Sequence, residues 1–91
     1  MSEPTAESPN AETITRWLVE RVAREIEQPP SEVSPKAPFA QYGIDSSRAA
    51  LIASELEEWV QMEISPGLLW DFTDIDSLAR FVADELRAGG S

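Results

Sequence analysis

The fold is decided by the stretch at residues 39–57, FAQYGIDSSRAALIASELE. Gly43 permits a sharp change of backbone direction, because glycine adopts conformations that other residues avoid. Asp45 has the properties of a helix N-cap, and it would place Ser46 at the first helical position with its side chain in solvent. The apolar residues that follow recur at helical spacing. The stretch therefore predicts a turn that leads directly into an amphipathic helix.

Ser46 would stand at a position with a defined electrostatic character. The first turn of a helix carries unpaired N–H groups and the positive end of the helix dipole, so it stabilises a phosphate group. The neighbouring carboxylate of Asp45 would offset part of that gain. A serine hydroxyl is a weak nucleophile without an activating base, and the chain contains no His and no Cys. This excludes a self-contained Ser-His-Asp or Cys-His site, and we expect no catalytic residue.

The pattern over residues 14–86 resembles the acyl carrier protein family, and Gly43-Ile44-Asp45-Ser46 resembles its phosphopantetheine attachment site. Asp45-Ser46 alone would be typical of any capped helix start, but the similarity continues well beyond it. The further matching residues are Phe39, Ala49, Ala50, Ile52, Leu56-Glu57, Leu68-Leu69-Trp70-Asp71-Phe72-Thr73-Asp74-Ile75 and Leu78-Ala79. The resemblance implies that Ser46 receives a 4'-phosphopantetheine arm from coenzyme A, with Gly43 and Asp45 shaping the site. The protein would then carry acyl groups as thioesters and would not be an enzyme.

The same resemblance implies a set of partner proteins. A phosphopantetheinyl transferase, with magnesium, would attach the arm, and an acyl-AMP ligase, acyltransferase, ketosynthase or similar enzyme would load and process the cargo. Ser47 stands where most acyl carriers have Leu or Met, and Leu51 stands where carriers of fatty-acid synthesis usually have an acidic residue, so the recognition surface differs from theirs. The stretches that make the chain more similar to carriers of polyketide or specialised-lipid pathways are Trp17-Leu18, Pro38-Phe39 and Leu68-Leu69-Trp70-Asp71. The residues expected to contact partners are Ile44, Ser47, Leu51, Glu55, Glu58 and Met62.

Composition sets bounds on the class of protein. Ninety-one residues form one small domain, and a net charge of −10 argues against binding to nucleic acid or to anionic membranes. An acidic surface suits basic partner enzymes, because complementary charge speeds their encounter. The absence of Cys excludes disulfides and zinc fingers and is compatible with the cytoplasm. The sequence has no apolar run of transmembrane length, and we expect a monomer.

The chain predicts an all-α domain, a small four-helix bundle with a long first loop and a short third helix. Residues 1–10 are expected to be a disordered N-terminal segment, residues 11–87 the carrier domain, and residues 88–91 a disordered tail. The four prolines within residues 29–45 exclude a helix there, so this segment should dock through its own side chains. The residues expected to dock it are Val33, Phe39, Tyr42 and Ile44.

Four apolar patterns locate the helices. Asn10 would cap the first, whose inward residues are Ile14, Trp17, Leu18, Val22 and Ile26. The second should cover about residues 46–62, with Ala49, Ile52, Leu56, Trp59 and Val60 inward. Ser65-Pro66 would open the short third helix through Leu68, Leu69 and Trp70. Thr73 or Asp74 would cap the fourth, with Ile75, Leu78, Val82 and Leu86 inward.

Other groupings of residues favour simpler interpretations. Glu55, Glu57, Glu58 and Glu63 form an acidic, solvated face, and no metal site is expected, since no His stands nearby. The three tryptophans are expected to pack in or beside the core. Two alternatives remain for function: a peptidyl carrier of nonribosomal peptide synthesis, and an acidic helical adaptor that is never modified.

Overall fold

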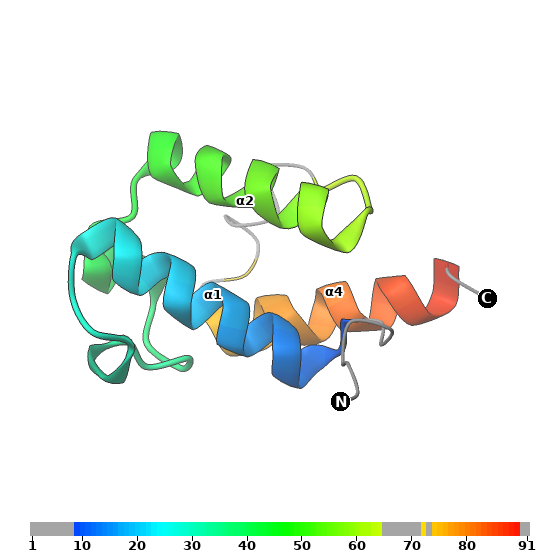
Figure 1. Ribbon diagram of the computed structural model, residues 1–91, viewed down its shortest axis with the longest axis horizontal. Helices are drawn as coiled ribbons and strands as arrows, with labels where there is room; N and C mark the ends of the chain where they lie inside the picture. Colours follow the sequence, from blue (N-terminus) through cyan, green and yellow to red (C-terminus); the bar gives the residue numbers. More distant parts are fainter. Residues whose placement is uncertain (1–8, 65–71, 73, 90–91) are drawn as a thin grey trace, which may run out of the picture.

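The computed structural model describes residues 9–64, 72 and 74–89 (Figure 1). Its three α-helices are α1 (Ala11–Ile26), α2 (Ser46–Val60) and α4 (Ile75–Gly89), and two short 3-10 helices precede α2, η2 (Pro30–Glu32) and η3 (Phe39–Tyr42). The described residues form no strand and only an isolated bridge between Pro38 and Asp74. The all-α prediction is confirmed. The predicted third helix falls on residues 65–71 and lies outside the described residues.

Local signals account for both ends of α1. The side chain of Asn10 accepts a hydrogen bond from the Thr13 N–H at 2.9 Å, and the Thr13 hydroxyl accepts one from the Asn10 N–H at 2.8 Å. This reciprocal capping box satisfies two backbone donors at the helix start. The helix ends at Ile26, and its C-cap Glu27 is left-handed with a φ of 59° and stands two residues before Pro29. The predicted cap of the first helix is therefore confirmed.

The helices enclose a single apolar core. Figure 1 shows α1 running antiparallel beside α4, with α2 on the other side of α1 and antiparallel to it. All three α-helices contribute fully buried side chains: Ile14, Leu18, Val22, Ile52, Leu56, Ile75, Leu78 and Val82. Each of these residues was predicted to face inward. Within the described residues, no helix is long and apolar enough to cross a membrane.

Three predictions about helix extent or orientation are wrong. α2 ends at Val60 instead of Met62, because Gln61 is left-handed and the Gln61 and Met62 N–H groups both donate to the Glu57 carbonyl. Trp59 is 38% exposed instead of inward, and its ring stacks on Trp17 of α1. α4 continues to Gly89, two residues past the predicted end of the domain.

The long segment before α2 is more regular than its prolines predicted. It contains η2 and η3, and this corrects the expectation that it holds no helix. Short 3-10 turns tolerate proline at their first position, where the missing N–H would be unpaired in any case. The predicted docking residues are confirmed, since three are buried and Tyr42 packs against the core. The Tyr42 hydroxyl also accepts a hydrogen bond from the Ser34 N–H at 2.7 Å.

The same segment is attached to the start of α4. The Asp76 N–H donates to the Pro35 carbonyl at 2.9 Å, and the Lys36 ammonium lies 3.6 Å from the Asp76 carboxylate. At the helix start, the Asp74 carboxylate accepts hydrogen bonds from both the N–H and the hydroxyl of Ser77. Asp74 therefore caps α4, as one of the two predicted candidates. These contacts hold the segment that delivers the chain to Ser46.

Candidate attachment site

The turn before α2 depends on a left-handed glycine. The Gly43 N–H donates to the Ala40 carbonyl at 3.0 Å as η3 closes, and Gly43 then adopts a φ of 72°. A Cβ atom placed on Gly43 would have no heavy atom within 4 Å. The need for glycine is therefore conformational and not steric, since this backbone region disfavours residues with a Cβ.

Ile44 and Asp45 convert this turn into a helix start. The Ile44 side chain is only 7% exposed and belongs to the core, so it anchors the chain between two exposed residues. The Asp45 carboxylate accepts a hydrogen bond from the Arg48 N–H at 3.0 Å, and the Asp45 carbonyl accepts one from the Ala49 N–H at 2.8 Å. Asp45 is thus the N-cap of α2, as predicted, and Ser46 is the first helical residue.

The Ser46 hydroxyl is exposed and makes no hydrogen bond to any residue that the structure describes. The N–H groups of Ser46 and Ser47 likewise have no acceptor within that part of the chain. An anionic group on the Ser46 oxygen would lie beside these free donors, at the positive end of the helix dipole. The residues present therefore fit a phosphodiester at Ser46.

A network of charged side chains joins the start of α2 to α1. The Arg21 guanidinium on α1 donates to Glu55 on α2 and, at 2.9 Å, to Glu25 on its own helix. Arg48, in the first turn of α2, lies 3.4 Å from the second oxygen of Glu25. Burial acts to lower the pKa of Arg21, but the hydrogen bonds to Glu55 and Glu25 and the negative charges of both carboxylates together outweigh burial and raise that pKa. Arg21 therefore remains charged at every working pH.

The family follows from a comparison with known proteins. The family described as "Phosphopantetheine attachment site" matches residues 16–82, well over half of the chain. The chain belongs to this family. Its members carry a covalent 4'-phosphopantetheine group and are not themselves catalysts. The chain is therefore a carrier protein.

Relatives and solved structures agree with this assignment. The carrier is 32% identical to the acyl carrier protein TtuC of Teredinibacter turnerae, over 89% of this chain and 90% of TtuC. It is 30% identical to the polyketide synthase PksM of Bacillus subtilis over 80% of this chain, and spans only 2% of PksM.

The solved structures include carriers of two named kinds. A free-standing peptidyl carrier protein of Acinetobacter baumannii has a TM-score of 0.81 and 31% identity, covering 86% of this chain and 98% of that one. The acyl carrier protein LipD of Actinoplanes friuliensis has a TM-score of 0.74 and 35% identity, covering 97% of each chain.

The structure separates the residues that were predicted to contact partners. Ser47, Leu51 and Glu58 are exposed on the outer face of α2, with Leu51 47% exposed. Glu55 forms an ion pair with Arg21 and lies on the edge of α2 that faces α1. Ile44 is buried, and Met62 lies beyond the end of α2 and packs against the core. The carrier therefore offers a smaller outer face than the sequence suggested.

Sequence reasoning missed the importance of Arg21 and Glu25. Arg21 lies among the buried positions of α1, seven residues after Ile14 and three after Leu18, where an apolar residue would be expected. A charged residue inside an apolar stripe, with Glu25 one turn later, is the signal that could have revealed a buried ion pair. The described residues contain no group of three or more His, Cys, Asp or Glu side chains that could hold a metal ion.

Proposed function

We propose that Ser46 carries the 4'-phosphopantetheine arm and that the protein is an acyl carrier in polyketide, fatty-acid-derived or other specialised-lipid biosynthesis. The observation that carries this proposal is the exposed Ser46 hydroxyl, free of hydrogen bonds to described residues, at the first position of α2. Gly43 and Asp45 support it by producing the turn and the cap that present this hydroxyl. Ser47 is also exposed, but it is the second helical residue, and Ser46 is the serine that directly follows the Gly43-Ile44-Asp45 turn.

Attachment of the arm is a phosphoryl transfer from coenzyme A. A bond forms between the Ser46 oxygen and the phosphorus that bears the pantetheine, and the pyrophosphate bond breaks with release of adenosine 3',5'-bisphosphate. The serine proton passes to a base that the transferase supplies, since no described side chain of the carrier hydrogen-bonds to this hydroxyl. The arm supplies a thiol that holds cargo as a thioester. The carrier anchors and tethers it, which raises the local concentration of cargo at each enzyme.

Acyl cargo is favoured over aminoacyl cargo by two observations. Both TtuC and LipD are named acyl carrier proteins, and both match nearly the whole chain at 32% and 35% identity. Ile44 also stands where peptidyl carriers usually have a second glycine. A peptidyl carrier remains the second candidate, because the solved Acinetobacter carrier of that kind is 31% identical.

The proposed partners are a phosphopantetheinyl transferase and enzymes that load and process acyl groups, such as an acyl-AMP ligase, an acyltransferase or a ketosynthase. We place these encounters in the cytoplasm, with the carrier as a monomer. Ser47, Leu51 and Glu58 form the outer face of α2 that the structure leaves open to such enzymes. The acidic chain would attract basic enzyme surfaces over long range.

The test is intact mass spectrometry after incubation with coenzyme A, magnesium and a broad-specificity transferase. The wild-type protein should gain the mass of one phosphopantetheine group, and Ser46→Ala should gain nothing. Ser47→Ala is the matched control and should be modified like the wild type. Circular dichroism should show that Ser46→Ala remains helical, because Asp45 still caps α2.

Each other outcome would change a defined part of the proposal. An unmodified wild-type protein would point to an adaptor, and modification of Ser46→Ala would move the arm to another serine. The cargo is read separately, from the mass of the protein isolated from its native host. An aminoacyl or peptidyl thioester in place of an acyl thioester would select the second candidate.

A further inference from the structure

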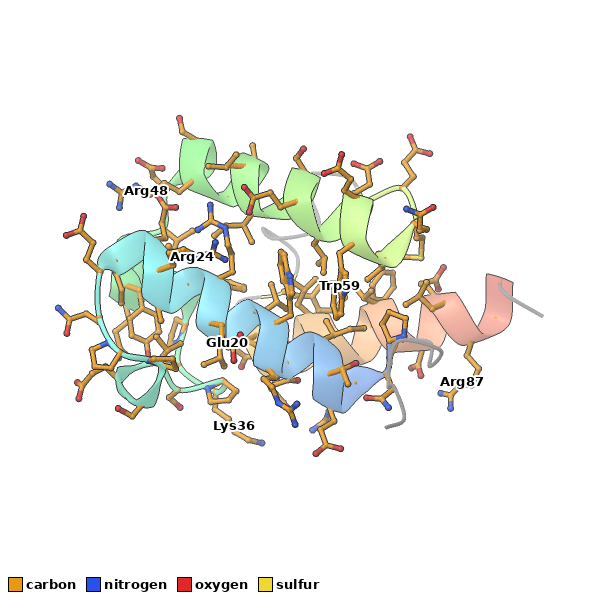
Figure 2. All side chains as sticks on the ribbon, in the orientation of Figure 1. Glu20, Arg24, Lys36, Arg48, Trp59 and Arg87 are labelled. Carbon is orange, nitrogen blue, oxygen red and sulfur yellow. The ribbon has the colours of Figure 1, made fainter. Side chains whose placement is uncertain are left out.

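Long side chains make the contacts along the outer edge between α1 and α2. The two helices are antiparallel (Figure 1), and three pairs bridge them in opposite order along the two chains. From the Ser46 end the pairs are Arg48–Glu25, Arg21–Glu55 and Trp17–Trp59. Figure 2 shows Arg48 at the start of α2 and Trp59 farther along it, both at this edge. We call these three pairs the α1–α2 bridge.

Arg21 is the central residue of the α1–α2 bridge. It is 6% exposed and is the buried charged residue of the described core, whereas Glu55 is much more open to solvent. A buried guanidinium must keep its carboxylate partners, because an unpaired charge away from water is costly. One of those partners is on α2. The need to neutralise Arg21 therefore constrains where α2 lies relative to α1.

The first turn of α2 has little apolar contact to hold it in place. Ser46, Ser47 and Arg48 are all exposed, and Ala49 is the first buried residue of the helix. Glu25 accepts from Arg21 through one oxygen and lies 3.4 Å from Arg48 through the other. The position of Arg48, two residues after Ser46, is thus linked through Glu25 to the buried Arg21. The hydrogen bonds of Arg21 to Glu55 and Glu25 are directional, so they fix orientation as well as proximity, and the ion pair of Arg48 with Glu25 adds attraction at the start of α2.

We propose that Arg21 is a positioning residue for attachment of the arm. From α1, it holds α2, and with it Ser46, through Glu55 in the third turn and through Glu25 and Arg48 at the first turn. The inference rests on the proposed function of Ser46, and it extends the attachment site to a helix that does not contain the serine. Misplacement of a nucleophile by about 1 Å can slow a reaction by as much as 10²-fold.

The test compares Arg21→Met and Glu55→Ala with the wild type in steady-state modification by a broad-specificity transferase. Arg21→Met keeps the aliphatic part of the side chain. Glu55→Ala leaves Arg21 paired with Glu25, and it provides a second test in case Arg21→Met does not fold. Arg80→Met is the matched control, because it removes an ion pair of the same i,i+4 spacing and the same 2.9 Å length as Arg21–Glu25. Assays are run where circular dichroism shows each protein to be fully folded.

The expected result is a loss in kcat of about tenfold for both bridge variants, with KM changed less than about twofold, as for an interaction that acts mainly in the transition state. Arg21→Lys should recover part of the loss, since an ammonium restores the charge but not the planar fork. Arg80→Met should match the wild type. Wild-type kcat in both folded bridge variants would overturn the inference.

A second measurement does not depend on modification at all. Amide hydrogen exchange should be faster in the bridge variants at Arg48 and Ala49, whose N–H groups close the first turn of α2. Exchange in α4 should be unchanged, whereas general destabilisation would accelerate exchange in both helices. Equal acceleration in both would assign Arg21 a purely structural role. A wild-type protein that is never modified would instead refute the proposed function and leave this exchange result standing.

Discussion

The two sides of α1 differ in how they hold the neighbouring helix. Beside α4, α1 lies close along much of its length, and buried aliphatic residues of both helices share one core. Beside α2, the outer edge is made by the α1–α2 bridge, with two charged pairs and one stacked aromatic pair. Aliphatic packing provides most of the stability but little directional information, whereas hydrogen-bonded charges provide orientation. The helix that carries Ser46 shares the core through Ile52 and Leu56, and its edge toward α1 adds the directional kind of contact.

The largest expected effect tests the aliphatic side of this comparison. Leu78 of α4 is fully buried, so Leu78→Ala should lower the free energy of unfolding by about 2–5 kcal/mol through lost burial and the cavity left behind. Urea unfolding followed by circular dichroism measures the change. A small domain has little stability to lose, and this variant should therefore be close to unfolding. A loss below about 1 kcal/mol would mean that the α1–α4 side is not the stable part of the molecule.

The next effect concerns the aromatic pair of the α1–α2 bridge. The rings of Trp17 and Trp59 stack with centroids 5.5 Å apart and planes 9° apart. Such pairs contribute about 0.5–1.5 kcal/mol beyond burial of their area. A double-mutant cycle with Trp17→Ala and Trp59→Ala should give a coupling energy in this range. The single variants should also change the near-ultraviolet circular dichroism. Additive effects of the two substitutions would show that the stack does not join the helices.

The next prediction compares how the stability contributed by the helix caps of α4 and α2 depends on pH. The hydroxyl and N–H of Ser77 hydrogen-bond to the Asp74 carboxylate and lower the pKa of Asp74 below its usual value. A lowered folded-state pKa adds stability above the unfolded pKa, and this stability is lost as the pH falls through the folded value. Asp74→Ala should therefore cost about 1 kcal/mol near pH 7. That cost should shrink once the pH is below about 4.

Thermal unfolding of wild-type and Asp74→Ala proteins between pH 7 and pH 3 checks this prediction. Asp45→Ala is the comparison at the start of α2, where, among the described residues, the carboxylate accepts a hydrogen bond from the Arg48 N–H alone. A difference between Asp74→Ala and the wild type that stays constant down to pH 3 would show that ionised Asp74 is not what stabilises the start of α4.

The smallest effect on stability concerns the outer face of α2. Leu51 is 47% exposed, so Leu51→Glu should change the free energy of unfolding by less than about 0.5 kcal/mol. If Leu51 is an apolar contact for a dedicated partner, the substitution should slow acyl loading or transfer by the cognate enzyme. Modification by a broad-specificity transferase should continue, because that contact centres on the start of α2.

Ser54→Glu provides the control for Leu51→Glu. Ser54 is also exposed on α2, so Ser54→Glu adds the same charge without removing an apolar side chain. Transfer kinetics that are equal in the wild type and in Leu51→Glu would direct the search for partner contacts to residues 29–45.

Short-range features of the sequence were sufficient to predict much of the molecule. Asn10 and Asp45 were recognised as caps from their side chains, and the turn at Gly43 from the conformational freedom of glycine. Apolar residues at helical spacing predicted the fully buried positions of all three α-helices. These features succeed because capping, left-handed turns and helical periodicity involve residues no more than a few positions apart.

Contacts between helices were decided only by the tertiary structure. The sequence placed Trp59 inward and Glu55 on an acidic solvated face, whereas the fold leaves Trp59 38% exposed and pairs Glu55 with Arg21. Helical periodicity identifies which side of a helix faces the protein interior. It does not identify which side chain of another helix, some thirty residues away in the chain, contacts that side. Arg21 and Glu55 are 34 residues apart, and only the folded chain brings together the two charges that we propose to position Ser46.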